Sequence, residues 1–297
     1  PEAALPVMEG KAVLFKELAG VDAFPLCLDT QDADEIVAVV KAIAPVFGGI
    51  NLEDISAPRC FEIERRLREA LEIPVIHDDQ HGTAIVVLAA FLNALRVTGM
   101  AIADVRVVMN GAGAAGTAVA NMLLAAGVVD LTICDSKGVI HAGRTDLTDT
   151  KRDLVARTNT RGITGGLADA VKDADVFIGV SAPGVLTGDM VRSMRPGPVI
   201  FALANPTPEI MPDEAKAAGA RIVATGRSDF PNQINNALGF PGIFRGALDH
   251  RVRNITREML TLAAKNLAAV VEAPDSEHIM PDIFDPRVVP AVAEAIR

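Results

Sequence analysis

The sequence predicts an α/β protein with two α/β domains, the second of Rossmann type, followed by C-terminal helices. Short apolar runs alternate with stretches of helical apolar spacing over most of the chain. A glycine-rich turn follows one such run at residues 105–110, and acidic or small polar residues follow several others. Alternation of this kind is typical of parallel sheets covered by helices. We expect domains at 1–98 and 99–248, and a helical segment at 249–297.

Composition and charge limit the classes of protein that need to be considered. The chain has 297 residues, half of them apolar, and a net charge of −10. Such a charge disfavours nucleic acid and anionic membrane surfaces as partners. No uninterrupted apolar run reaches membrane-spanning length, and the first residues lack the features of a signal peptide. The cysteines, Cys27, Cys60 and Cys134, lack metal-type spacing, so we predict a cytoplasmic protein with reduced thiols.

Three strand and helix pairs are predicted before residue 98. The chain starts without Met and enters a helical pattern at 11–18, so we expect an N-terminal portion to be missing. The strands are expected at 24–28, 49–52 and 73–76, and the helices at 32–43, 59–71 and 82–95. Asp32 is suited to cap the first of these helices.

Two of these strands are followed by paired carboxylates. Glu53 and Asp54 follow the strand at 49–52, and Asp78 and Asp79 form a tight polar turn after the strand at 73–76. The carboxyl ends of neighbouring parallel strands face the ligand crevice of an open sheet, so the four carboxylates should converge. Oxygen-rich clusters suit Mg²⁺ or Mn²⁺. Helix capping by Asp79 or Thr83 is the alternative, and the repeated pair favours the metal site.

A dinucleotide fingerprint begins the second predicted domain. The strand at 105–110 leads into Gly111, Ala112, Gly113, Ala114, Ala115 and Gly116, then into a helix at 114–126 and a strand at 131–134. Gly111 permits the turn, Gly113 lets the backbone approach a pyrophosphate, and Gly116 lets the helix pack closely. The helix N-terminus offers N–H groups to the phosphates.

The residues after the second strand of this unit bear on the choice of cofactor. Asp135 stands about 20 residues past the motif, where an acidic residue accepts the ribose hydroxyls, and it favours NAD. Ser136 and Lys137 could instead serve the 2′-phosphate of NADP. Lys137 is equally well explained as an exposed turn cation, so both cofactors remain open.

The rest of the chain continues the alternation. Strands are predicted at 176–180, 199–203 and 221–224, and helices at 154–157, 166–172, 190–194, 214–218, 255–271 and 288–296. Ser181 and Asn205 follow two of these strands and suit a nucleotide crevice, although Asn205 alone would be a turn residue before Pro206. Residues 230–245 are dense in Pro, Asn, Gly and Phe. Composition favours a packed loop there, and its amides, Asn236 among them, are candidates for binding a substrate carboxylate.

Together these motifs resemble the malic enzymes, in particular the short bacterial type. The resemblance is carried by residues 5–11, 51–55, 77–84, the glycine fingerprint, 204–206 and 235–236. It implies oxidative decarboxylation of malate to pyruvate and CO₂, with reduction of NAD or NADP and dependence on Mg²⁺ or Mn²⁺. It also implies a homo-oligomer, expected to be a dimer, for which the Ala-rich helix at 255–271 offers an apolar face.

The resemblance also implies roles for individual residues. Lys11 matches the general base, which needs a depressed pKa, and Asp78 matches a carboxylate that hydrogen-bonds near it. Glu53, Asp54 and Asp79 match the metal ligands. Asn205 and Asn236 match amides that hold malate. The cofactor site is expected at Gly111, Gly113, Ala114, Ala115, Gly116, Asp135, Ser181 and Asn205.

The sequence departs from the family pattern in one respect. In the family, a tyrosine acts as the acid that protonates the enol, and an arginine binds the substrate. Both come from a segment upstream of the Lys11 motif, and these 297 residues contain no tyrosine. We therefore expect this chain alone to bind metal and cofactor but to turn malate over poorly. The alternatives are another NAD(P)-dependent α/β dehydrogenase, which would not need two carboxylate pairs, and a non-catalytic nucleotide-binding module.

Overall fold

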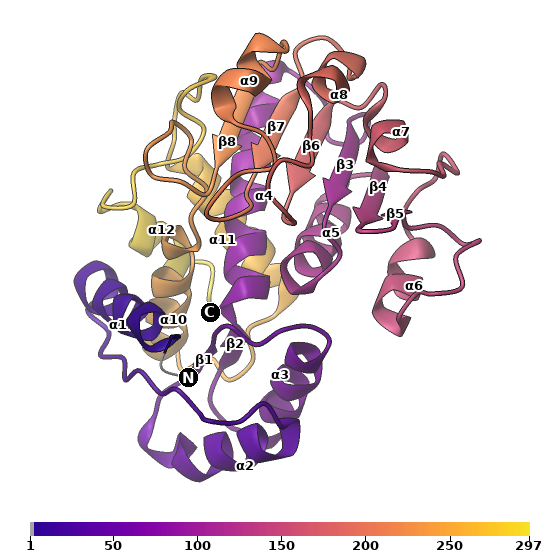
Figure 1. The fold of residues 1–297 in the computed structure, drawn as a ribbon. Coiled ribbons are helices and arrows are strands. Elements are labelled where there is room, and N and C mark those ends of the chain that lie inside the picture. The colour runs from indigo at the N-terminus through magenta and orange to yellow at the C-terminus, as the bar shows by residue number, and fades with distance from the viewer. Residues whose placement is uncertain (1–2) are drawn as a thin grey trace. The chain divides into compact units, whose positions relative to one another are not determined.

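The computed structural model describes residues 3–297, which form two compact units (Figure 1). The first unit contains the residues up to Val86 together with Asn236–Val270 and Pro281–Arg297. The second contains Val87–Asn235 and Val271–Met280. The predicted domains, 1–98, 99–248 and 249–297, differ from these units because residues 87–98 pack with the second unit and most of the C-terminal segment packs with the first. Pro1 and Glu2 lie outside the described residues.

The N-terminal part of the first unit is built on two short parallel strands. Its elements are α1 (Leu5–Ala19), α2 (Ala33–Ile43), η1 (Ala44–Val46), β1 (Ile50–Leu52), α3 (Arg59–Ala70), β2 (Val75–His77) and the first turns of α4 (Asp78–Thr98). Ile50 pairs with Val75 and Leu52 with His77, so both strands end at the same edge. The side chain of Asp32 accepts hydrogen bonds from two backbone N–H groups and caps α2, as predicted.

Four helical elements complete the first unit: η2 (Asn236–Leu238), α10 (Phe240–Asp249), α11 (Arg257–Ala269) and α12 (Val288–Ala293). Gly246 of α10 lies against the carbonyl of Ala293, where a Cβ atom would clash. Asn266 of α11 donates a 2.9 Å hydrogen bond to the Ala291 carbonyl. The apolar side of α11, including Leu260 and Leu267, is buried within the chain. This side was expected to serve an oligomer interface, and intramolecular packing already occupies it.

The second unit holds a six-stranded sheet in the order β5-β4-β3-β6-β7-β8. The strands are β3 (Arg106–Asn110), β4 (Asp130–Asp135), β5 (Gly138–Val139), β6 (Val176–Gly179), β7 (Val199–Ala202) and β8 (Ile222–Thr225). All pairings are parallel except that of β5 with β4. The helices are α5 (Ala114–Ala126), α6 (Asp149–Val155), α7 (Leu167–Val171), α8 (Gly188–Ser193) and α9 (Pro212–Ala217).

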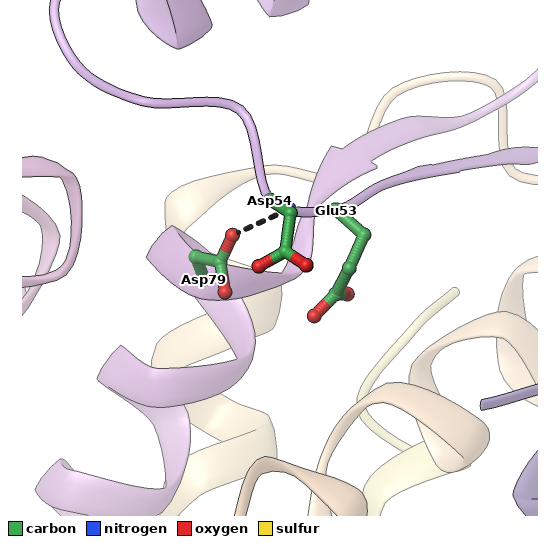
Figure 2. Close-up of side chains that lie close together, drawn as sticks. All are labelled: Glu53, Asp54 and Asp79. Atoms are coloured by element: carbon green, nitrogen blue, oxygen red, sulfur yellow. Dashed lines mark hydrogen bonds between the residues drawn. The ribbon is translucent and has the colours of Figure 1, made fainter. Parts of the chain in front are cut away.

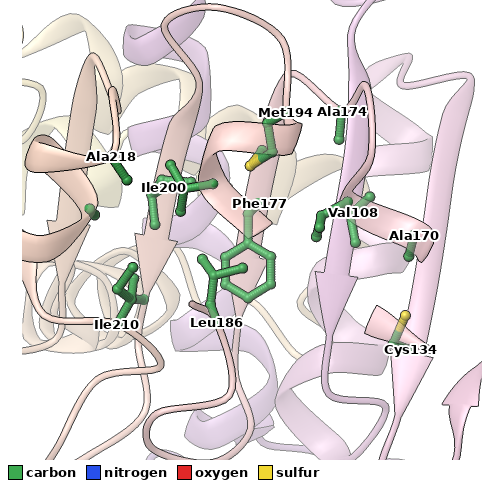
Figure 3. Packing of buried hydrophobic residues seen from close by; sticks show 14 of the residues in the cluster. Val108, Cys134, Ala170, Ala174, Phe177, Leu186, Met194, Ile200, Ile210 and Ala218 are labelled. Atoms are coloured by element: carbon green, nitrogen blue, oxygen red, sulfur yellow. The ribbon is translucent and has the colours of Figure 1, made fainter. Parts of the chain in front are cut away.

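One buried cluster on this sheet consists mainly of aliphatic side chains packed around Phe177. Phe177 is fully buried among Val108, Leu186 and Ile200 (Figure 3). Burying a side chain of this size is worth roughly 1.5–3 kcal/mol, so these strands need apolar residues on both faces. The predicted α/β class with a Rossmann-type second domain is confirmed.

Several predicted elements differ from the structure. Residues 24–28 are irregular rather than a strand, and Phe24 and Leu26 are 69% and 50% exposed. The first helix starts at Leu5, because proline is tolerated in a first turn. The predicted loop at 230–245 contains the start of α10. Two glycines in that helix lie close to α12, where a side chain would not fit. These glycines therefore indicate close helix packing rather than a loop.

Helix α4 begins at Asp78 itself, so the expected polar turn is a helical turn. It is the one helix within residues 3–297 that is long and apolar enough to cross a membrane by length and composition. Two thirds of its apolar window (67%) is buried within the structure, as in the core helix of a globular protein. An N-terminal turn places Asp78 and Asp79 where the helix dipole favours negative charge.

Candidate active site

Three carboxylates from two elements meet in the first unit. Glu53 and Asp54 directly follow β1, and Asp79 lies in the first turn of α4 (Figure 2). One carboxylate oxygen from each residue lies within 4.8 Å of the others. The backbone N–H of Asp54 donates to Asp79 Oδ2 at 2.9 Å, which ties the β1 loop to the helix. The structure thus brings together the three residues predicted as metal ligands.

The fourth carboxylate, Asp78, points to a different partner. Lys11 Nζ of α1 donates to Asp78 Oδ2 and lies 3.1 Å from Glu53 Oε2. Asn236 Nδ2 also donates to Asp78 Oδ2, at 2.5 Å. The ammonium of Lys11 lies 4.5 Å from the ring centroid of Phe240, within cation–π range. Three of the four carboxylates that were predicted to converge therefore do so. Asp78 instead accepts hydrogen bonds from Lys11, the predicted base, and from Asn236, the predicted substrate-binding amide.

Burial and mutual repulsion dominate the electrostatics of this cluster. Burial, together with the charge of Asp78, raises the pKa of Glu53 to about 8. Burial likewise raises the pKa of Asp78 above its ordinary value, although the Lys11 ammonium opposes that shift. The cluster holds more negative charge than Lys11 alone compensates.

The pKa of Lys11 is raised by its neighbours, whereas a general base needs a depressed pKa. Burial lowers the pKa of the Lys11 ammonium, but the adjacent Asp78 and Glu53 carboxylates outweigh burial and raise it. Lys11 is therefore held as a cation here.

The donor set fits a hard divalent cation. Carboxylate oxygens are the ligands that Mg²⁺ and Mn²⁺ prefer, and Glu53, Asp54 and Asp79 supply three within one small region. A dication would also offset the excess negative charge that raises the pKa of Glu53. The residues present therefore suit the predicted metal.

A buried carboxylate behind this site was not predicted. Glu64 of α3 is 6% exposed, and it accepts a hydrogen bond from Gln80 Nε2 at 3.1 Å. Its other oxygen lies 2.7 Å from His81 Nε2. Glu64 thereby fixes the first turn of α4, which carries Asp78 and Asp79. Helical spacing places it beside the buried Cys60, Ile63 and Leu67, and a carboxylate on an apolar face was a signal available in the sequence.

The candidate base and two of the candidate metal ligands border a pocket of about 680 Å³ in the first unit. Lys11, Glu53 and Asp54 contribute to its lining, and much of the remainder is apolar, including Phe15 and Phe244. Charged groups at the edge of an apolar pocket are typical of small-molecule sites.

The glycine fingerprint of the second unit has the geometry that the sequence predicts. Gly111 has a φ of 119°, and a Cβ atom there would lie 2.5 Å from the Val180 carbonyl oxygen. A Cβ atom on Gly116 would clash with the Gly111 carbonyl, so α5 packs against the turn. Gly113 precedes α5, and a Cβ atom there would meet nothing within 4 Å. This open space lies before the turn of Ala114 and Ala115, where a phosphate would meet the helix N-terminus.

Ser181 and Asn205 follow β6 and β7 at the same edge of the sheet. Asn110 Nδ2 donates to Ser181 Oγ at 2.8 Å. The fully buried Glu209, which the sequence analysis missed, accepts hydrogen bonds from the backbone N–H groups of Ser181 and Ala204, each at 2.9 Å. Glu209 thus fixes the segments that carry both candidates. Asn205 belongs to the second unit and Asn236 to the first, so their joint role in holding malate remains a prediction.

Asp135 ends β4, at the position predicted for ribose binding, and its carboxylate is already paired. Arg144 donates to both of its oxygens, at 2.7 and 3.1 Å, and Lys151 Nζ donates at 2.6 Å. The Lys137 backbone N–H donates at 2.9 Å. Although burial opposes it, these donors lower the pKa of Asp135 to about 2. The predicted role as a ribose acceptor stays a prediction, with these contacts as its main obstacle.

Comparison with known proteins identifies the relatives of this chain. Residues 2–68 match the malic enzyme N-terminal domain, and residues 80–296 match the malic enzyme NAD binding domain. The chain belongs to the malic enzyme family. It is 56% identical to a bifunctional malic/malolactic enzyme of Bacillus subtilis and 56% identical to an NAD-dependent malic enzyme of Geobacillus stearothermophilus, with all of this chain aligned to each. An NADP-dependent malic enzyme of Haemophilus influenzae is 48% identical over 99% of the chain.

Solved structures of malic enzymes match the whole chain. The NAD-dependent malic enzyme of Thermotoga maritima superposes with a TM-score of 0.96 at 50% identity, and the malic enzyme of Pyrococcus horikoshii with 0.95 at 51%. The resemblance to malic enzymes inferred from the motifs is confirmed, as is the class of NAD(P)-dependent oxidoreductase.

The chain is shorter than these malic enzymes. It covers 73% of the Bacillus subtilis relative, 62% of the Geobacillus stearothermophilus relative and 41% of the Haemophilus influenzae relative. It covers 78% of the Thermotoga maritima structure.

Proposed function

We propose that this chain oxidises malate to pyruvate and CO₂ with reduction of NAD or NADP, and that Mg²⁺ or Mn²⁺ is required. The observation that carries the proposal is the set of three carboxylates, within 4.8 Å of one another, next to the ion pair of Lys11 and Asp78. A nucleotide fold alone would need no such cluster. Membership of the malic enzyme family supports the same reaction.

Glu53, Asp54 and Asp79 would hold the cation. When bound, it would supply Lewis acidity toward the C2 oxygen of malate and would offset the negative charge that now keeps Lys11 protonated. Lys11 then takes the proton of the C2 hydroxyl, while Asp78 orients the lysine through the observed hydrogen bond. Asn236 holds a malate oxygen by its amide, which already reaches Asp78.

The nucleotide is proposed to bind at the fingerprint of the second unit. The backbone at Gly113, Ala114 and Ala115 would bind the pyrophosphate, and Ser181 and Asn205 would line the nicotinamide side of the sheet edge. Bound there, the nicotinamide would accept the hydride from C2 of malate, and the β-keto acid left behind would lose CO₂ and take up a proton at C3 to give pyruvate. We also propose a homodimer, as the resemblance to malic enzymes implies, and a cytoplasmic location.

The test measures three properties of the purified chain separately: Mn²⁺ binding by electron paramagnetic resonance, nucleotide binding by calorimetry, and absorbance of reduced cofactor formed from malate. We expect one Mn²⁺ site and malate-dependent, EDTA-sensitive cofactor reduction. We predict slow turnover, because the 297 residues contain no tyrosine. Nucleotide binding without a Mn²⁺ site would contradict the proposal and favour another α/β dehydrogenase.

A further inference from the structure

Glu209 is a fully buried carboxylate in the loop between β7 and α9, and the proposed reaction gives it no role. Its Oε1 accepts hydrogen bonds from the backbone N–H of Ser181 at 2.9 Å and from the Ser181 hydroxyl at 3.2 Å, and its Oε2 accepts from the Ala204 N–H at 2.9 Å. Because Asn110 Nδ2 donates to the same hydroxyl, the hydroxyl proton is left for Glu209. Three donors thus reach both oxygens, which suits an ionised carboxylate, since that group only accepts.

The surrounding backbone leaves room for this side chain and holds it in place. A Cβ atom on Gly179, the last residue of β6, would lie 2.4 Å from Glu209 Cδ. The Glu209 carbonyl accepts from the Leu186 N–H at 3.0 Å, and the Pro208 carbonyl accepts from the Gly184 N–H at 3.1 Å. Main-chain and side-chain bonds therefore join the loops after β6 and β7 at Glu209, and its carboxylate cannot move away without disrupting both loops.

The charge of Glu209 is not compensated by a cation. Within residues 3–297, its side-chain hydrogen bonds come from neutral groups. Arg227 reaches the same loop through the Pro206 carbonyl, but it is paired with Asp229 by bonds of 2.8 and 2.6 Å. Neutral donors stabilise a carboxylate and leave its unit charge in place. A buried charge acts over several ångströms and is screened little by salt.

This carboxylate lies behind the sheet edge at which the nicotinamide is proposed to bind. Its donors, Ser181 and Ala204, follow β6 and β7, and Asn205 comes next in the chain. In the strand order, β6 and β7 lie on the opposite side of β3 from β4. A dinucleotide with its pyrophosphate at the fingerprint after β3 and its adenosine at β4 therefore extends its nicotinamide over β6 and β7.

The nicotinamide is the part of the cofactor whose charge changes in the reaction. The oxidised ring is a pyridinium cation, and the reduced ring is a neutral dihydropyridine. A fixed negative charge near the ring stabilises the cation by Coulomb attraction and gives the neutral ring no such stabilisation.

We propose that Glu209 biases this chain toward the oxidised nucleotide, by attraction between its carboxylate and the pyridinium ring. The charge retains the oxidised form for turnover and gives the reduced product no comparable hold. This inference rests on the proposed function in assuming that a nicotinamide nucleotide binds at the fingerprint. It does not depend on malate, on the metal or on the choice between NAD and NADP.

The test measures the affinities of oxidised and reduced NAD, and of oxidised and reduced NADP, by calorimetry without malate or metal. Glu209→Gln keeps the size of the side chain and removes its charge, whereas Glu209→Asp keeps the charge and shortens the side chain. We expect Glu209→Gln to lower the affinity for the oxidised form relative to the reduced form by about tenfold, because a unit charge is worth that much over several ångströms at an effective dielectric constant of about 20. Glu209→Asp should keep the ratio of the unaltered chain, even where both affinities fall.

Asp213→Asn is the matched control, since it removes an exposed carboxylate from the first turn of α9. Solvent screens that charge, so the ratio should not change. An equal fall of both affinities in Glu209→Gln would overturn the proposal, because it would show that Glu209 only holds the loops together. A shift of the ratio in Asp213→Asn as large as that in Glu209→Gln would also overturn it, because it would show a general effect of charge.

A second measurement on the unaltered chain does not depend on how any variant folds. The oxidised nucleotide should bind at least about tenfold more tightly than the corresponding ADP-ribose, which lacks only the nicotinamide. Added salt should leave that difference largely unchanged, because the carboxylate is buried. Equal binding of the two would overturn the role of Glu209 and leave the proposed nucleotide site standing. Binding of none of these nucleotides would overturn both proposals.

Discussion

The two charged clusters of this protein have opposite imbalances. In the first unit, one lysine pairs with two of four neighbouring carboxylates, and burial and repulsion raise the pKa of Glu53 to about 8. In the second unit, three cations face the carboxylates of Asp135 and Asp146, and hydrogen bonds from those cations lower the pKa of Asp135 to about 2 despite its burial. The first cluster lacks positive charge and suits a metal cation, whereas the second has positive charge to spare and suits an anion. The balance of charges around each carboxylate thus predicts the sign of the charge on the ligand that each cluster would bind.

Lys11→Met should have the largest effect on catalysis. Loss of a general base lowers turnover by about 10² to 10⁴-fold. Mn²⁺ affinity should be kept or increased, because the variant removes the cation that competes for Glu53. Steady-state kinetics and Mn²⁺ titration measure the two effects, with Lys16→Met on the exposed side of the same helix as control. Parallel loss of turnover and metal binding would show that Lys11 is structural.

Asp79→Asn tests whether the acidic cluster is a metal site. It removes one of three carboxylates, while the amide oxygen of asparagine can still accept the Asp54 backbone hydrogen bond. We expect Mn²⁺ affinity to fall by about 100-fold or more, since even residues that only orient metal ligands are worth about 10–100-fold. The exposed Asp34→Asn on α2 is the control. Unchanged Mn²⁺ affinity in Asp79→Asn would show that the acidic cluster is not a metal site, and the contrast between the two clusters would then not hold.

Glu53→Gln should stabilise the chain in EDTA at alkaline pH. The folded chain binds the Glu53 proton more tightly than the unfolded chain does, so this stabilisation is present below pH 4.5 and is lost as the pH rises toward 8. A neutral amide avoids that loss, and the melting temperature of Glu53→Gln should exceed that of the unaltered chain by a few degrees above pH 8. Added Mn²⁺ should reverse the order, because only the intact site gains stability from the ion. Glu62→Gln, exposed on α3, should show neither effect.

Asp135→Asn should have the smallest effect, with the opposite dependence on pH. The pKa of Asp135 is depressed, so its stabilisation is present above pH 3.8 and is lost as the pH falls toward 2. Thermal melts at neutral pH should show a loss of a few degrees, which disappears near pH 2. Asp153→Asn on the exposed side of α6 is the control. A variant as stable as the control at neutral pH would mean that the cations around Asp135 add nothing to folding.

Local sequence patterns predicted most of the elements that position the site. Helix α5 begins and ends where the spacing placed it, because the glycine turn and the apolar period both act within a few residues. The prediction of a strand at 24–28 was wrong, since an apolar run becomes a strand only where a neighbouring strand can pair with it. Helix α10 was missed because its glycines are explained by close packing against the α12 region, almost 50 residues further along the chain.

By itself, the sequence determined the α/β class, the dinucleotide turn and the residue types of the carboxylate cluster that is proposed to bind a metal. These depend on backbone conformations and on chemistry within short segments. Only the tertiary structure decided how the charges are shared: Asp78 pairs with Lys11 rather than joining the other carboxylates, Glu64 fixes the first turn of α4, and Asp135 is surrounded by cations. Charge interactions depend on distance and burial between segments far apart in sequence, and the order of residues along the chain specifies neither.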